Sequence, residues 1–477
     1  MTTQTSLLLA GLLVIPCLST NTQARVNIVN TGLSLSYDYD DRKYETVNTS
    51  GDLGERVDFS DNNDYRSIAI TPLIRLISTG LKDRFEIQAS PSLRYDLIDS
   101  ETDWDHNFSL AVERSINKNW RLIGSNFLLR SDYYDSSFSS DSETTQDTSL
   151  ELSADFGRSQ YWRNTFNIDS EHLYGQESVV DFGFSYIILR NDDSEFRTYE
   201  DYDSYEGSIT NEHRFNQKWR ELTEISVIRG EFETTGLSDL LTGDDSLSDD
   251  LMEYHLLLTG ENNFSRQTTL SLFYNYIGTK YDDSLQVDGD IHQVQLRWIH
   301  NYSRQTTITL GAGPSYEKSE DQDSNTGGNG IAEITYRSEH GSFTFGVEKL
   351  YDVDNFSGTT ERGFVDSWET RLLADYQILP SLVIDGHIRY TYEDRNDRPA
   401  RLSDSFSSTD PSGDIILEEY HNDIFVSNIG LRYNFLRNYT ASLEYTFTKQ
   451  ESDILGDDYD DHRVLVSFSW EQNILHW

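Results

Sequence analysis

The amino-acid sequence predicts an all-β fold, a transmembrane antiparallel up-and-down β-barrel of about 22 strands. Apolar and polar residues alternate strictly in segment after segment, which is the pattern of strands with one apolar face. Aromatic residues reach 13% while hydrophobic residues total only 36%, a balance that an outward apolar face around a polar interior produces. Short and long connections alternate between the segments, as in a meander that crosses a membrane back and forth.

The chain opens with a segment that predicts a secretory signal peptide, residues 1–24. Its apolar core, residues 7–18, is too short to span a membrane as a helix, and small residues lead to Ala24. The signal lacks the usual Lys or Arg near its start. The lipoprotein alternative at Cys17 lacks a small residue before it, because Pro16 stands there. We therefore expect cleavage after Ala24, which leaves a single barrel domain over residues 25–477.

Cysteine usage and charge exclude several functions. The only cysteine, Cys17, lies in the predicted signal, so the mature chain has no disulfide, thiolate metal site, Cys nucleophile or covalent haem. The formal net charge of −44 disfavours a nucleic-acid partner. The 11 histidines are scattered, and His106 and Ser109 lie on opposite faces of one predicted strand. We therefore predict a protein that is not an enzyme, with no catalytic, cofactor-binding or metal-binding residues.

The alternation places each strand. In residues 82–97, Phe85 and Ile87 share an apolar face while Glu86 and Gln88 share the polar one. The weakest alternation is that of 194–201, and about 20 strands is the lower count that the pattern allows. The predicted strands are 31–40, 66–78, 82–97, 104–115, 120–133, 147–157, 161–173, 178–190, 194–201, 204–215, 219–232, 250–263, 267–280, 289–302, 306–318, 328–338, 342–351, 364–376, 381–394, 419–434, 439–450 and 461–472.

Connections of two lengths predict the two ends of the barrel. Aromatic residues follow several short turns, as at Trp120, Trp162, Trp219 and Tyr439, which suits girdles at a membrane interface. A soluble sandwich or propeller is disfavoured, because the apolar face continues through nearly every strand while the other face carries both Glu and Arg. The short connections are TGLK, INKN, RSQ, NDD, NQK, SRQ (twice), SEHG, ILP and LRN, and the long ones are 41–65, 134–146, 233–249, 352–363 and 395–418.

One short phrase occurs twice, as NFSRQTTLSL at 263–272 and NYSRQTTITL at 301–310. Arg266 and Arg304 could hold an anion, but a duplicated turn at one end of the barrel explains the phrase better. Phe264 and Tyr302 would then be interfacial aromatic residues, with both arginines facing water or phosphate headgroups. FLRNYTASLEY, at 435–445, repeats the same logic with other residues.

The predicted lumen carries charges of both signs. Such a wall forms cross-lumen ion-pair ladders, a selectivity ring or, most simply, a solvated polar surface. A plug domain is not expected, because few residues precede the first strand and no connection is long enough. The lumen is then open water, is narrowed by charged side chains and folded-in loops, or is filled by a separate partner. The lumen residues are predicted to be Arg75, Arg94, Arg297, Arg337, Arg371, Arg389, Arg432, Glu86, Glu113, Glu151, Glu224, Glu253, Glu333, Glu369, Asp375 and Asp385.

The excess negative charge falls in the predicted external loops, above all 233–250 and 451–461. Such loops attract cations, including divalent ions that bridge lipopolysaccharide phosphates. Within 321–330, Asp and Asn occupy alternate positions as in a calcium loop. Thr326 and Ala332 stand where that loop needs Gly and Glu, so it fails as an EF-hand.

Over essentially its whole mature length the chain resembles Gram-negative outer-membrane β-barrel proteins, which also end in an aromatic residue, here Trp477. Leu475 fits the terminal alternation of such barrels and Asn473 does not. The stretch GLSLSYDYDDR at 32–42 resembles the opening strand of barrels associated with exopolysaccharide or exosortase (PEP-CTERM) systems. These resemblances imply location in the outer membrane with both termini periplasmic. The implied partners are outer-membrane lipid, lipopolysaccharide and the barrel insertion machinery.

Three classes of function remain open on the sequence. The first is a passive or export-associated conduit, with a link to exopolysaccharide secretion. The second is a sheath for a separate periplasmic partner such as a multihaem cytochrome, although this chain lacks the Cys-x-x-Cys motif of the best-known sheath family. The third is a structural or surface-interaction barrel whose acidic loops matter more than its lumen.

Overall fold

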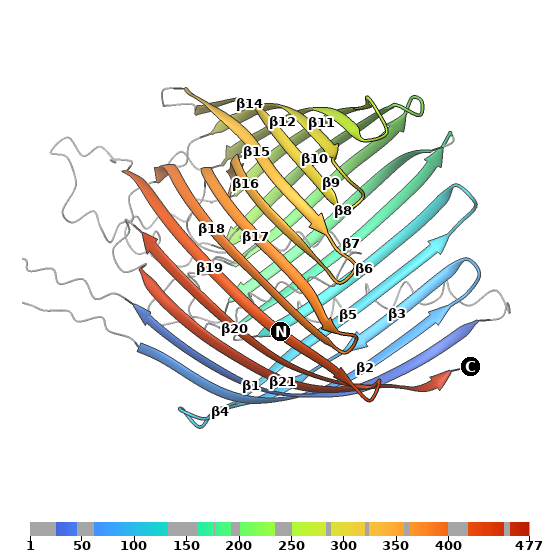
Figure 1. Cartoon of the computed structure of the whole chain (residues 1–477), viewed down its shortest axis with the longest axis vertical. Helices are drawn as coiled ribbons and strands as arrows, with labels where there is room; N and C mark the ends of the chain where they lie inside the picture. Colours follow the sequence, from blue (N-terminus) through green and yellow to red (C-terminus); the bar gives the residue numbers. More distant parts are fainter. Residues whose placement is uncertain are drawn as a thin grey trace, which may run out of the picture.

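The computed structural model describes residues 25–44, 62–131, 160–175, 177–191, 201–233, 250–282, 288–319, 324–356, 363–398, 418–452 and 458–476. These residues form one antiparallel sheet that closes on itself (Figure 1). None of the described residues forms a helix that could cross a membrane. The strands are β1(Val26–Tyr44), β2(Asn62–Thr79), β3(Asp83–Ala89), β4(Ser92–Asp96), β5(Thr102–Ser115), β6(Trp120–Ser131), β7(Tyr161–Tyr174), β8(Ser178–Asn191), β9(Asp201–Arg214), β10(Trp219–Glu233), β11(Leu251–Asn263), β12(Thr268–Tyr281), β13(Gly289–Asn301), β14(Thr306–Ser319), β15(Asn325–Arg337), β16(Gly341–Val353), β17(Phe364–Leu379), β18(Leu382–Arg398), β19(Glu418–Phe435), β20(Tyr439–Ser452) and β21(Tyr459–His476).

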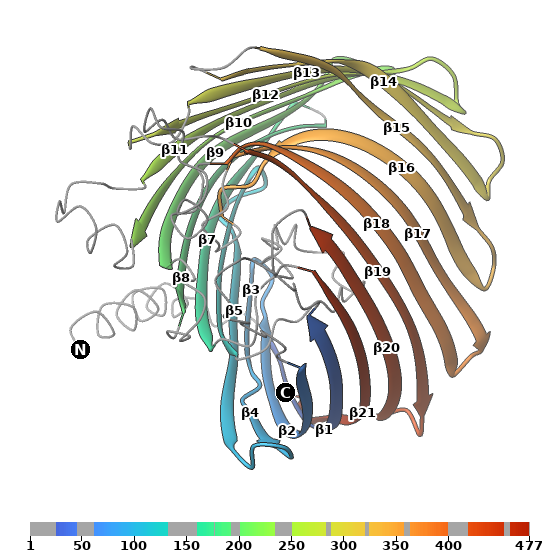
Figure 2. The ribbon, with the colours of Figure 1, turned by 90° about the vertical axis from the view of Figure 1, so that its left-hand side faces the viewer.

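The wall has twenty strand positions. Strands β3 and β4 both pair with β2 on one side and β5 on the other, so they are two halves of one position, interrupted at Ser90 and Pro91. A proline cannot donate to a strand ladder, which explains the break. The 21 strands therefore make 21 − 1 = 20 positions, and pairing of β1 with both β2 and β21 closes the circle (Figure 2).

The structure has the lower of the two predicted strand counts. The predicted strand at 147–157 and most of the one at 194–201 lie outside the described residues. Because β6 pairs directly with β7 and β8 pairs directly with β9, the wall closes without either of them. The other twenty predicted ranges each coincide with one wall position. The count of 22 results from alternation within the two connections, which resembles that of a strand.

Because two strands too many were predicted, the two strands between them, β7 and β8, were predicted to run in the wrong direction across the wall. The turns RSQ and NDD, predicted at the short-turn end, border the opposite end, where β7 begins and β8 ends. The actual short turn joins Tyr174 to Ser178 and includes Gly175 at φ 66°, a backbone conformation that favours glycine. Trp162 therefore lies at the loop end, whereas Trp120, Trp219 and Tyr439 begin strands at the short-turn end as predicted.

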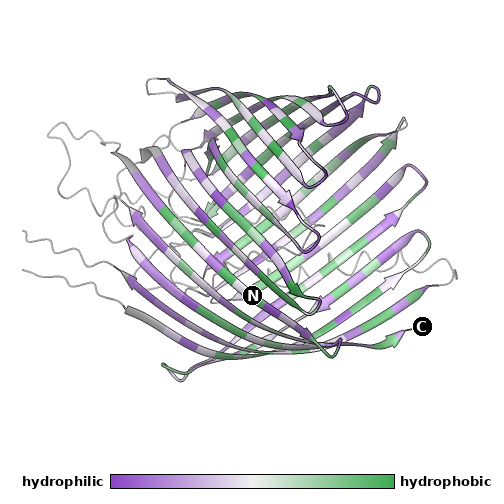
Figure 3. Cartoon of the chain, in the orientation of Figure 1, coloured by the Kyte–Doolittle hydropathy of each residue, from purple (hydrophilic) through white to green (hydrophobic). Residues whose placement is uncertain are grey.

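The strand registers give the barrel two distinct faces. Leu35 pairs with Ile70 on one side and Phe468 on the other, and such apolar side chains stand roughly half exposed on the outer face. Hydrophobic and hydrophilic residues alternate along the strands in Figure 3. Every predicted lumen residue that the structure describes falls on the other, inner face, and Glu151 lies outside the described residues.

The duplicated phrase is a duplicated turn. Both copies link two neighbouring strands at the end where β1 starts and β21 finishes. In each copy a threonine hydroxyl donates to the asparagine that closes the preceding strand: Thr269 to Asn263 and Thr307 to Asn301, both at 2.9 Å. Phe264 and Tyr302 are 72% and 73% exposed, as interfacial aromatic residues should be. The turn prediction is confirmed.

The third turn keeps the hydrogen bond but changes the backbone. Thr440 Oγ1 donates to Asn434 Oδ1 at 2.8 Å, as in the two exact copies. Leu436 and Arg437, however, have φ of 51° and 64°, the left-handed conformation found in tight two-residue hairpins. One side-chain contact therefore recurs at three turns with two different backbones.

Candidate lumen constriction

Ion pairs on the inner face run along the wall. Arg121 on β6 bridges Glu113 on β5, at 3.3 Å, and Glu171 on β7. Arg220 on β10 bridges Glu212 on β9, at 3.1 Å, and Glu261 on β11, at 2.7 Å. These pairs join side chains on neighbouring strands. They link adjacent strands along the wall and do not cross the lumen.

Four strands, β13 to β16, fold into a tight corner. Three glycines on the inner face of β14 and β15 make this corner possible, because added side-chain atoms would collide. A Cβ on Gly313 would lie 1.7 Å from the carbonyl oxygen of Val294, and one on Gly327 would lie 2.1 Å from the Tyr351 hydroxyl. A Cβ on Gly311 would lie 2.9 Å from the side chain of Arg297. Strands β13 and β16 thus face each other across the corner.

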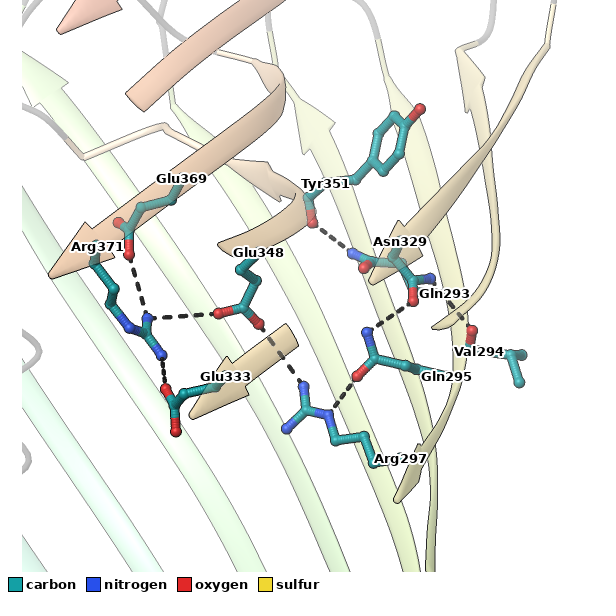
Figure 4. A network of polar contacts seen from close by, with 10 residues as sticks. All are labelled: Gln293, Val294, Gln295, Arg297, Asn329, Glu333, Glu348, Tyr351, Glu369 and Arg371. Atoms are coloured by element: carbon teal, nitrogen blue, oxygen red, sulfur yellow. Dashed lines mark hydrogen bonds and ion pairs between the residues drawn. The ribbon is translucent and has the colours of Figure 1, made fainter. Parts of the chain in front are cut away.

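Side-chain amides fill the corner (Figure 4). Gln295 on β13 donates to Asn329 on β15 at 3.1 Å, and Asn329 donates to the Pro314 carbonyl at 3.0 Å. Gln293 donates to the backbone carbonyl of Tyr351 on β16. Gln293 and Gln295 are 2% and 1% exposed, so side chains fill the corner at these two residues and leave no open space for solutes beside them. Buried amides of this kind need partners, and these have them.

A charged cluster borders the corner on the lumen side. Arg371 on β17 contacts Glu333 at 2.7 Å, Glu369 at 3.2 Å and Glu348 at 3.6 Å (Figure 4). Arg297 on β13 reaches Glu348 on β16 at 3.9 Å, an ion pair that spans the corner. Two guanidinium groups thus hold three carboxylates together. Of the predicted lumen residues, the structure unites Arg297, Arg371, Glu333 and Glu369.

The loop end of the β16–β17 hairpin separates from β15 and lies over the inner faces of β12 and β13, while β17 stays paired with β18 as far as Val365. Pairing of β16 with β15 stops at Lys349, while its pairing with β17 continues to Val353. We call residues 350–356 and 363–366 the inner tip. Tyr351 and Phe364 bury themselves against Ile277 and Ile291, which belong to the inner faces of β12 and β13. The inner tip therefore occupies part of the bore near its loop end.

Phe356 anchors the inner tip to a more distant part of the wall. Its ring lies among Leu189, Tyr202, Phe232 and Leu251, one side chain from the inner face of each of β8 to β11. The ring centroids of Phe356 and Tyr202 are 5.6 Å apart, and those of Phe356 and Phe232 are 5.7 Å apart. All five side chains are at most 8% exposed. The contact forms a small apolar core inside the lumen.

Asn355 supplies the polar half of this anchor. Its Nδ2 donates to Oε1 of Glu253 at 2.6 Å, and its Oδ1 accepts from the Tyr281 hydroxyl at 2.7 Å. The same oxygen accepts from the backbone N–H of Gly363 at 3.1 Å. Glu253 Oε2 lies 2.9 Å from Nε2 of His255. Asn355 is 3% exposed, so all three bonds are sheltered from water.

The inner face of β7 to β10 carries a group of acidic side chains. Asp169, Asp181, Glu206 and Glu224 occupy inner-face positions on four successive strands, β7 to β10. Asp169 is within electrostatic reach of Asp181 and Glu206, and Glu206 is within reach of Glu224. The sequence pattern had indicated only Glu224 and Glu253 in this region. Asp169, Asp181 and Glu206 lie on the polar face of predicted strands, but they were not among the predicted lumen residues.

Several candidates predicted from the sequence gain no site from the structure. In the calcium-loop candidate, Asn325 and Thr326 belong to β15, while 321–323 lie outside the described residues. The acidic loops 234–249 and 453–457, the signal 1–24 and Trp477 also lie outside them. The described residues contain no group of three or more His, Cys, Asp or Glu arranged to hold a metal ion.

No family model matches the chain, and no curated protein matches it. Solved structures match it over most of its length. The outer membrane protein OpdK from Pseudomonas aeruginosa is 11% identical over 93% of this chain and 99% of its own, with a TM-score of 0.40. OccAB4 from Acinetobacter baumannii is 13% identical over 95% and 100%, with a TM-score of 0.43. The siderophore receptor PirA from Pseudomonas aeruginosa is 10% identical over 92% and 80%, with a TM-score of 0.49. At such identities and TM-scores these likenesses carry no conclusion, and the barrel rests on the strand pairing of this chain.

Proposed function

We propose that this protein is an outer-membrane barrel that acts as a passive conduit for small hydrophilic solutes. The observation that carries the proposal is a closed wall with an apolar outer face and a charged inner face. Leu272 and Leu296, for example, are 56% and 58% exposed on the outer face, which a soluble protein would cover. In a bilayer the same residues face lipid, and pairing of β1 with β21 closes the sheet.

The end with short turns is proposed to face the periplasm, and the end with long connections the outside. Bacterial barrels have short periplasmic turns and longer external loops. The same end holds the start of β1 and the end of β21, so both termini would be periplasmic. Outer-membrane lipid, lipopolysaccharide and the barrel insertion machinery would then be the partners.

The conduit is proposed to prefer cations. Asp169, Asp181, Glu206 and Glu224 line one side of the bore, and like charges on low-dielectric walls raise the local concentration of counter-ions in the water between them. On the other side, Arg297 and Arg371 are engaged by three carboxylates. A net acidic bore would pass small cations and neutral solutes more readily than anions.

The inner tip and the packed corner favour a small solute over a large occupant. A sheath for a periplasmic partner such as a multihaem cytochrome needs the space that these elements fill. The link to exopolysaccharide, which rests on residues 32–42, stays a prediction, and transport measurements with oligosaccharides test it. The same holds for a purely structural or surface-interaction barrel, which would not conduct.

Planar-bilayer recording tests the proposal directly. The purified barrel is expected to give stable single-channel currents, and a potassium chloride gradient is expected to give a reversal potential of the sign for cation preference. A protein that inserts as a folded barrel and passes no current would refute the conduit. Anion preference would refute the assignment of the acidic wall while leaving a conduit in place. Co-purification of a haem protein would favour the sheath.

A further inference from the structure

We infer that the inner tip sets the bore of the conduit, and that Asn355 and Phe356 are the residues that hold it in its narrow position. The inference rests on the proposed conduit and names the element that limits solute size. It follows from the contacts of the tip, which is held on the wall by a buried ring and by buried hydrogen bonds.

The anchor joins two distant parts of the chain. Asn355 and Glu253 are 102 residues apart, and Phe356 meets side chains from four consecutive strands that are remote from its own hairpin. On one side the tip keeps its ladder with β18 as far as Val365. On the other side it departs from β15 after Lys349 and is bound to β8–β13 by burial and hydrogen bonds.

A glycine in the wall leaves room for the Phe356 ring. Gly230 on β10 faces the lumen, and a Cβ there would lie 2.7 Å from the Phe356 ring and 2.6 Å from that of Phe232. Glycine weakens a strand interior unless a close approach requires it. The binding site of the Phe356 ring therefore depends on the absence of a side chain at Gly230, on a strand remote from the hairpin of the tip.

Three single changes release the tip by different physical routes. Asn355→Asp places a carboxylate against Glu253 and removes the donor of the 2.6 Å bond. Phe356→Ala removes the ring from the apolar core. Gly230→Val fills the binding site of the ring from the wall side without altering the tip. Gly260→Ala on β11 is the matched control, because a Cβ there meets nothing within 4 Å.

A paired exchange separates release of the tip from general damage. In Glu253→Gln/Asn355→Asp, the glutamine amide can donate to the new carboxylate, so donor and acceptor trade places. The Tyr281 hydroxyl and the Gly363 N–H can still donate to residue 355. The double variant should regain the properties of the original protein, which a misfolded barrel could not do.

Single-channel conductance and the passage of neutral solutes of increasing size are the first readouts. The three release variants should conduct more and admit larger solutes, while Gly260→Ala and the paired exchange should match the original protein. Unchanged conductance in all three release variants would overturn the inference.

A second readout does not need conduction. Leu189 is 0% exposed beneath Phe356, and a chain expressed from Arg25 has no cysteine, so Leu189→Cys introduces one buried thiol. A polar maleimide should label it slowly in the original background and at least about tenfold faster with Asn355→Asp, since loss of a buried charged hydrogen bond shifts local opening by that order. Equal labelling rates would refute the anchor even if no variant conducts, whereas silent recordings with altered labelling would refute only the conduit.

Discussion

Replacement of Arg371 by glutamine tests whether the charged cluster holds the corner in place. The guanidinium contacts Glu333 at 2.7 Å, Glu369 at 3.2 Å and Glu348 at 3.6 Å, and the arginine side chain is 32% exposed. The three glutamates are 16% to 29% exposed. Without Arg371, their carboxylates would face one another across the corner with Arg297 as the remaining cation.

The magnitude follows from partial burial. Exposed ion pairs contribute about 0.2–1 kcal/mol each, and removal of one partner of a buried pair costs about 3–5 kcal/mol. Three contacts at intermediate burial place Arg371→Gln at about 2–3 kcal/mol of lost unfolding free energy. Arg84→Gln is the control, because Arg84 makes an exposed contact with Glu86 and its loss should cost no more than about 1 kcal/mol.

Urea titration of the barrel in phospholipid vesicles, followed by tryptophan fluorescence, measures these differences. Adding Glu333→Gln to Arg371→Gln should recover part of the loss, because one of the opposed charges is removed. An Arg371→Gln barrel as stable as Arg84→Gln would refute the reasoning. The reasoning would also be refuted if the double variant lost, relative to Arg371→Gln, as much unfolding free energy as Glu333→Gln loses on its own.

Three further changes test the corner, the two faces and the repeated turn by the same titration. Gly313→Ala should cost about 1–3 kcal/mol, because its Cβ would enter the backbone of β13, whereas Gly260→Ala should change stability little. Leu296→Arg on the outer face should cost about 2–4 kcal/mol in a bilayer, whereas Asn275→Arg on the inner face should be nearly neutral, and equal effects would contradict the assigned faces. Asn301→Ala should cost about 1 kcal/mol through its lost turn hydrogen bond, and no loss would show that the repeated contact is dispensable.

Strand positions and faces could be predicted from the sequence because both depend on neighbouring residues. A side chain's face in a strand follows from parity alone, so Arg75, Glu253 and Arg389 could be placed on the inner face without any knowledge of their surroundings. Parity also made the prediction fragile. Two surplus strands reversed the directions of β7 and β8 and moved Trp162 to the wrong end.

Narrowing of the lumen by folded-in loops was one of the predicted alternatives, but the residues of the constriction could not be predicted, because their contacts depend on closure of the barrel. Phe356 and Asn355 fall in a connection that resembles an ordinary external loop, and their partners on the wall lie 74 residues away or more in the chain. The glycines of the corner gave a usable signal: Gly311, Gly313 and Gly327 share the inner face of two paired strands. Repeated loss of side chains on one face of a hairpin indicates that something approaches it closely.

The distant anchor of the inner tip has a consequence for the order of folding. The tip belongs to β16 and β17, but the residues that bind Phe356 belong to β8 to β11. The contact therefore cannot form until both stretches of wall have formed. Contacts of such long separation carry a large closure entropy and form late. We therefore expect the inner tip to reach its place only after both stretches of wall have formed, which makes the final width of the bore a late product of folding.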